Sequence, residues 1–215
     1  MFDFEPEEFR RLCAELGERI GWQRAAVCAC NDPVSGRRDR QCTLCGGVGY
    51  VYTQVTEASN YRALVRQVDE RKEFWHAGQL YLGDVTITTM PDELPIAEND
   101  LVTLTERRFE REEVITRSDG TFDALHWTPI AELIAVRTVD REYTVGEGNE
   151  VVAADSGIQW LTTPPAAGTR VTAVYYWTPC YVILASMTTT RRLVGGTYLP
   201  QRVVGRLKGR ADYRQ

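Results

Sequence analysis

Four cysteines crowded into one short stretch, residues 27–52, constrain this chain more than any other feature of its sequence. They form two close pairs, one with a single residue between the thiols and one with two. The four are Cys28, Cys30, Cys42 and Cys45. Turn-forming residues, among them Asn31, Asp32 and Gly36, lie between the pairs and let the chain double back. The spacing therefore predicts a tetrahedral four-cysteine site for a structural zinc ion.

Two other uses of these thiols remain open. A disulfide, for example between Cys30 and Cys42, suits the same spacing. A redox-active Cys-x-x-Cys motif is the second, although no thioredoxin-like βαβ pattern surrounds it. A catalytic zinc ion is not expected, because such sites keep one position open and usually recruit histidine or carboxylate ligands. The only histidines, His76 and His126, are far from the cysteines in sequence.

The residues that accompany the thiols suit a metal site. Gly46, Gly47 and Gly49 follow the second pair, so backbone amides can approach the sulfurs closely. Three loop arginines can offset the negative charge of four thiolates around one Zn²⁺. They are Arg37, Arg38 and Arg40. The second pair with its glycines resembles one half-site of the DnaJ-type zinc module. The first pair departs from that module and its other repeats are absent, so chaperone function is not implied.

Composition narrows the class of protein. The 215 residues suffice for one large or two small domains. No apolar run approaches the roughly 18 residues of a membrane span, and the acidic N-terminus lacks the features of a signal peptide. We therefore expect folding in a cytoplasm, where reduced thiols favour metal over disulfide. The net charge of -5 argues against a general nucleic-acid binder.

The periodicity of apolar residues changes along the chain. The stretch from Glu5 to Ile20 is predicted to be a helix, with Cys13 as a small core residue on its apolar stripe. Beyond the cysteines, short runs of β-branched and aromatic residues alternate with turn formers. The strongest run, 169–178, places four apolar side chains on one face. They are Val171, Ala173, Tyr175 and Trp177.

This pattern predicts a mainly β protein. We expect an N-terminal helix in residues 1–26 and a zinc-binding loop in 27–52. A single β-sandwich or barrel-like domain would fill 53–200, and a basic tail would occupy 201–215.

Motifs for catalysis are missing from the sequence. There is no GxGxxG motif, no P-loop and no Gly-x-Ser-x-Gly motif. His76 and His126 lie beside aromatic residues and are expected to pack rather than to act as bases. Cys180 follows a strand and a proline, which favours burial over nucleophilic chemistry. We therefore expect no enzymatic activity.

The C-terminal segment is basic. Its cations are Arg202, Arg206, Lys208, Arg210 and Arg214, against one acid, Asp212. We predict that this tail contacts a partner, either an acidic neighbouring subunit or a phosphate backbone. The alternative is an ordinary exposed tail. In either case the β domain is expected to fold without it.

Several stretches resemble virion structural proteins of tailed bacteriophages, from the neck or head-tail connector region. They are the cysteine loop running into residues 49–52, and residues 83–103, 164–176 and 199–203. The resemblance implies a non-enzymatic ring component of the adaptor, collar or head-closure type. Its partners would be copies of itself, neighbouring connector or tail proteins, and DNA passing through the ring. It would lie in the host cytoplasm during assembly and then in the virion.

Two other functions stay open at this stage. One is a tail or baseplate structural protein. The other is a zinc-ribbon module that binds nucleic acid through the cysteine loop and the basic tail.

Overall fold

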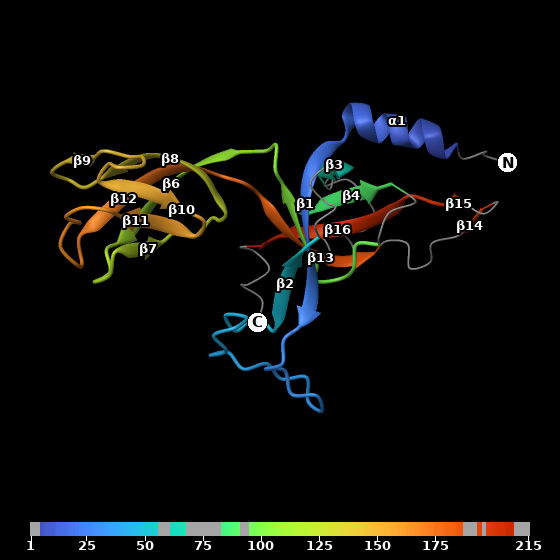
Figure 1. The fold of residues 1–215 in the computed structure, drawn as a ribbon, viewed down its shortest axis with the longest axis horizontal. Helices are drawn as coiled ribbons and strands as arrows, with labels where there is room; N and C mark the ends of the chain where they lie inside the picture. Colours follow the sequence, from blue (N-terminus) through green and yellow to red (C-terminus); the bar gives the residue numbers. More distant parts are fainter. Residues whose placement is uncertain are drawn as a thin grey trace. The chain divides into compact units, whose positions relative to one another are not determined.

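The computed structural model describes residues 5–55, 61–67, 83–90, 95–186, 193–194 and 197–208. The chain forms two compact units, which Figure 1 shows as ribbons. Unit 1 comprises Met1–Leu104 and Tyr181–Gln215, and unit 2 comprises Thr105–Cys180. The predicted mainly β class with an N-terminal helix is confirmed. The predicted single β domain is instead two units, because each unit buries its own apolar residues. The sequence did not indicate this division, since no low-complexity linker marks the insertion.

The helix α1 spans Pro6–Leu16 and is shorter than expected. Pro6 suits the first turn, and the acidic side chains of that turn lie at the positive end of the helix dipole. The helix ends because Gly17 turns into extended backbone and donates its N–H to the Cys13 carbonyl. A side chain at Gly17 would lie 2.2 Å from that oxygen. Cys13 is fully buried, as predicted.

Unit 1 is a closed barrel. Its strands are β1 (Glu18–Val27), β2 (Tyr50–Gln54), β3 (Arg62–Gln67), β4 (Val85–Thr89), β5 (Leu101–Leu104), β13 (Cys180–Ser186) and β16 (Gln201–Leu207), with a small β14 (Leu193–Val194) and β15 (Thr197–Tyr198) pair. The strand order is β2-β1-β3-β4-β16-β13-β5, and β5 also pairs with β1. That last pairing closes the ring of strands β1-β3-β4-β16-β13-β5 and leaves no free edge in it.

The barrel interior is filled by apolar side chains. Its core is Ile20, Trp22, Tyr61, Ala63, Val85, Ile87, Ile96, Val102, Leu104, Tyr181, Ile183 and Val203. Ile20 and Trp22 come from β1, a segment that the sequence analysis assigned to the helix region. The sequence analysis missed this strand because its alternating apolar residues directly follow the apolar stripe of the helix.

A buried carboxylate joins two strands of the barrel. Asp100 accepts a hydrogen bond from the Trp22 indole N–H at 2.8 Å. It also accepts the backbone N–H groups of Ala25 and Ala97, both at 2.8 Å. Its side chain is inaccessible to solvent. Asp100 thus connects β1 to the loop that leads into β5.

The predicted C-terminal tail is wrong for residues 201–207. They form β16, which pairs with β4 on one side and β13 on the other. This strand was missed because the buried Val203 and Val204 are adjacent rather than alternating with polar residues, and cations surround them. Deletion from Arg202 onward would remove this strand and open the barrel, so the expectation that the β domain folds without it is also wrong.

Unit 2 contains two sheets. Its strands are β6 (Phe109–Thr116), β7 (Phe122–Ala124), β8 (Ile130–Arg137), β9 (Glu142–Tyr143), β10 (Val151–Ala154), β11 (Gly157–Trp160) and β12 (Arg170–Trp177). The sheets have the orders β6-β12-β8-β9 and β10-β11-β7. Tyr143 of one sheet contacts Trp160 of the other edge to face, with ring centroids 5.1 Å apart. The predicted apolar face of β12 is confirmed, since its four side chains are buried.

A buried ion pair lies in unit 2. Asp123 accepts the Trp160 indole N–H at 2.7 Å and the Ser118 backbone N–H at 2.7 Å. The Arg117 guanidinium lies 3.3 Å from the same carboxylate and 5.6 Å from the Trp160 ring centre. Burial raises the pKa of Asp123, but these hydrogen bonds and the Arg117 charge outweigh it, so the pKa is lowered.

We predict that Asp100→Ala destabilises unit 1 by about 3 kcal/mol, because the buried Trp22 indole N–H and two part-buried backbone N–H groups lose their acceptor. Urea denaturation of wild type and variant measures the change. Glu98→Ala is the matched control, because this acidic side chain is exposed in the same loop. Equal stability of Asp100→Ala and Glu98→Ala would contradict the role assigned to Asp100.

We also predict that Asp123 makes unit 2 sensitive to acid. Because its folded pKa is lowered, its stabilisation is fully present above the unfolded pKa of about 4 and is lost as pH falls through the folded pKa. The difference in unfolding free energy between wild type and Asp123→Asn should therefore shrink below about pH 4. Asp155→Asn, at an exposed position, should show no such trend. A constant difference across the acid range would refute the assignment.

Candidate metal centre

The four predicted cysteines lie on a loop held by two strands of unit 1. Strands β1 and β2 pair from Gln23↔Gln54 to Val27↔Tyr50. They extend from the barrel and carry residues 28–49, the cysteine arm, at their ends (Figure 1). The Cys28 N–H donates to the Gly49 carbonyl at 2.9 Å, which continues the strand pairing into the arm. The strand pairing therefore reaches the first cysteine of the arm.

The four sulfur atoms converge. All lie within 4.8 Å of one another. The Cys28 and Cys42 sulfurs are 3.8 Å apart, and the Cys30 and Cys45 sulfurs are 3.5 Å apart. A tetrahedral zinc ion with Zn–S bonds of about 2.3 Å requires sulfurs about 3.8 Å apart. The four residues thus fit a metal ion, as predicted.

The disulfide alternative does not describe this structure. A disulfide bond holds its two sulfurs about 2.05 Å apart. The paired sulfurs of the cluster are 3.8 and 3.5 Å apart, well beyond that bond length. Cys180 is buried, as predicted.

The first turn of the arm is held by polar side chains. The Asp32 carboxylate accepts the N–H groups of Val34 and Ser35, both at 2.8 Å, and these bonds lower its pKa. The Asn31 amide donates to the carbonyls of Cys28 and Gly49 at 3.0 and 2.7 Å. Asn31 therefore ties the first cysteine pair to the strand that leaves the arm.

Glycines permit the second turn. Gly46 and Gly47 have φ of 60° and 80°, a region that disfavours other residues. A side chain at Gly47 would also lie 2.5 Å from the Arg40 carbonyl. Gly49 donates its N–H to the Cys45 sulfur at 3.3 Å. The predicted approach of backbone amides to the sulfurs is thus confirmed at Gly49.

Two thiols have shifted pKa values. Desolvation raises the pKa of Cys30, and hydrogen bonding with Cys45 raises it further, to about 12. Desolvation also raises the pKa of Cys45, but the Gly49 N–H and the neighbouring thiols outweigh it and lower the pKa to about 7. Cys45 is therefore the more acidic of the two. Metal binding deprotonates coordinating thiols, so affinity at this site should fall with decreasing pH.

The donor set indicates a closed site. Four thiolates fill a tetrahedral metal ion and leave no position for water or substrate. His126 lies in unit 2, where its ring contacts Trp127 with centroids 5.2 Å apart. His76 lies outside the described residues. The cluster could thus hold one metal ion by thiolate ligands alone.

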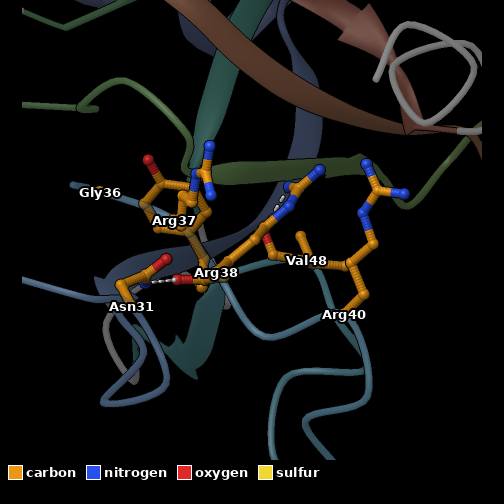
Figure 2. Close-up of a pocket in the computed structure, with 8 residues that line it drawn as sticks. Asn31, Gly36, Arg37, Arg38, Arg40 and Val48 are labelled. Atoms are coloured by element: carbon orange, nitrogen blue, oxygen red, sulfur yellow. Dashed lines mark hydrogen bonds between the residues drawn. The ribbon is translucent and has the colours of Figure 1, made fainter.

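The three arginines of the arm line a cleft of about 590 Å³. Its walls are Asn31, Gly36, Arg37, Arg38, Arg40, Val48, Gly49 and Tyr50. Figure 2 shows the arginines at this cleft and the bond from Arg38 to the Val48 carbonyl, which is 2.8 Å long. No cysteine belongs to the lining. The sequence identified these arginines as countercharges for thiolates and missed the cleft, because its opposite wall comes from residues 48–50.

The predicted partner-binding cations occupy different environments. Arg206 forms an ion pair with Asp84 at 2.9 Å, and both side chains are largely buried. Arg202 is exposed on β16, and Lys208 is half-buried. Arg210 and Arg214 lie outside the described residues. Arg206 thus has a structural partner that the sequence did not indicate, since Asp84 is 122 residues away. A partner-binding role for these cations stays a prediction.

The described helix is neither long nor apolar enough to cross a membrane. Comparison with protein-family models and with curated proteins finds no match to this chain.

We predict that Cys42→Ser abolishes stoichiometric metal binding and loosens the arm, because three thiols no longer enclose the ion. Elemental analysis should find about one zinc ion per wild-type chain, and hydrogen exchange in 28–49 should accelerate in the variant. Cys13→Ala is the control, since this buried cysteine lies outside the cluster. Retention of one metal ion by Cys42→Ser, or a metal-free wild-type protein with intact thiols, would contradict the site.

Proposed function

We propose that the chain is a non-enzymatic structural component of a tailed-phage particle, forming or joining a ring at the head-tail interface. The observation that carries this proposal is the cysteine arm, a cross-linked element held beyond the barrel by two paired strands. Its metal ion is zinc with a structural role. In this role the arm is the contact element to a neighbouring subunit or connector protein.

The surface of the arm suits a contact with another protein. Val34 is 95% exposed and Leu44 is 67% exposed. Apolar side chains on a rigid support bury well against a partner, and little ordering entropy opposes the contact. The arm has too few apolar residues to order itself, which is why a metal cross-link is needed. The acidic composition of the chain would avoid trapping DNA in a ring.

Two alternative functions differ in how the structure bears on them. A tail or baseplate position would use the same arm in the same way. A zinc-ribbon module for nucleic acid is favoured by the arginine cleft of the arm. It is disfavoured by Arg206, whose charge is already paired with Asp84. Protein assembly is therefore the function we propose.

We predict that Val34→Asp blocks incorporation of the chain into phage particles while the protein still folds, because a desolvated charge would replace an apolar contact. Mass spectrometry of purified particles measures incorporation, and circular dichroism and zinc content check the fold. Val139→Asp is the matched control, since Val139 is 97% exposed in unit 2. Cryo-electron microscopy of wild-type particles should locate the chain in a ring between head and tail.

Two outcomes would contradict the proposal. One is the absence of the wild-type chain from purified particles. The other is normal incorporation of Val34→Asp, which would remove the arm from the assembly contact.

A further inference from the structure

We propose that the arginine cleft of the cysteine arm binds the carboxylates of an acidic segment of a partner protein. The inference does not depend on the phage role and concerns only what enters this cleft. The guanidinium groups of Arg37 and Arg40 lie at this cleft. Among the residues that the structure describes, neither forms an ion pair or a side-chain hydrogen bond. Both side chains are exposed at the cleft.

The acidic residues of the arm do not neutralise these cations. Asp32 is engaged by the N–H groups of Val34 and Ser35. The Asp39 carboxylate accepts the Gln41 N–H at 2.8 Å. Both carboxylates therefore serve as turn caps within their own loops. The arginines keep their charge available at the cleft.

The thiolate cluster does not satisfy the arginines either. Within the described part of the chain, the sulfurs receive hydrogen bonds from the N–H groups of Gly49 and Asp39 and from one another, and none from a guanidinium. The cleft lining contains all three arginines and no cysteine. The arginines are thus directed to a space outside the metal site. Attraction to the thiolates at longer range leaves the hydrogen-bond donors of Arg37 and Arg40 unused.

The walls of the cleft are preorganised. Arg38 donates to the Val48 carbonyl at 2.8 Å, so one guanidinium is already oriented. Asn31 bridges two carbonyls across the base of the arm. The cysteine cluster holds the same two turns together. A binding site with its backbone already ordered loses less entropy when a ligand enters.

Carboxylates of a protein fit this site better than a nucleic acid does. Guanidinium groups bind carboxylates with two parallel hydrogen bonds. Tyr50 is the one aromatic residue among the cleft walls, so successive bases would have no row of rings to stack on. Val34 and Leu44 are exposed on the same arm and offer apolar contacts to a polypeptide.

Fluorescence anisotropy with the zinc-loaded full chain tests the inference. The probes are a fluorescein-labelled hexaglutamate peptide and a labelled oligothymidylate of equal charge. We expect the peptide to bind more tightly than the oligonucleotide. The double variant Arg37→Ala/Arg40→Ala should weaken peptide binding by about tenfold or more, because two charge-assisted contacts are lost. Arg38 is left intact because it braces the cleft wall.

The matched control is Arg66→Ala/Arg170→Ala, which removes the same charge from exposed positions on β3 and β12. It should change peptide affinity by less than about twofold. Zinc content and circular dichroism establish that both double variants are folded. Absence of peptide binding, or equal losses in the two double variants, would overturn the inference. Tighter oligonucleotide binding that the cleft variant abolishes would also overturn it and would assign the cleft to nucleic acid.

Discussion

The carboxylate of Asp100 accepts one hydrogen bond from the barrel core and another from the strand that leaves the barrel. Trp22 points into the interior, whereas Ala25 lies in the part of β1 that continues toward the cysteine arm. Strand β1 pairs with β5 only as far as Gln23, so beyond that residue it needs another acceptor along its edge. Asp100 supplies that acceptor, and thereby connects closure of the barrel with the base of the arm.

Unit 2 contains the same kind of buried aspartate–tryptophan hydrogen bond in a different arrangement of strands. In each unit a buried aspartate accepts an indole N–H, from Trp22 to Asp100 and from Trp160 to Asp123. A large aromatic residue fills the core, and its polar atom requires a partner there. An arginine also lies over each indole ring, with its guanidinium carbon 5.0 and 5.6 Å from the ring centroids. Both cores thus combine apolar filling with a buried carboxylate that accepts an indole N–H.

The cysteine arm depends on a different source of order. Its exposed apolar residues contribute little burial, so the two turns are held by short-range hydrogen bonds and by the convergence of four sulfurs. The side chains on the outer surface of the arm are therefore not needed to hold its two turns together. Apolar side chains and unpaired guanidinium groups can therefore face outward without weakening the fold. A rigid support with an unsatisfied surface is what a contact element requires.

Local spacing determined the parts of this protein that local chemistry controls. The cysteine spacing predicted the cluster, the alternation in 169–178 predicted the buried face of β12, and the helical stripe predicted burial of Cys13. In each case the interacting residues are close in sequence, or their period is set by the backbone.

Tertiary pairing decided the rest. In sequence, residues 201–207 resemble a basic tail, but in the structure they form a strand with β4 and β13 on its two edges. The sequence indicated no partner within the chain for Arg206, but its charge is paired with Asp84. The insertion of unit 2 between β5 and β13 likewise brings together segments of unit 1 that are distant in sequence. The arginine cleft lies within residues 31–50 and depends on how the two turns of the arm fold back on each other. Closure of the barrel and burial of charge determine the contacts between distant segments, and neither produces a periodic pattern in a single sequence.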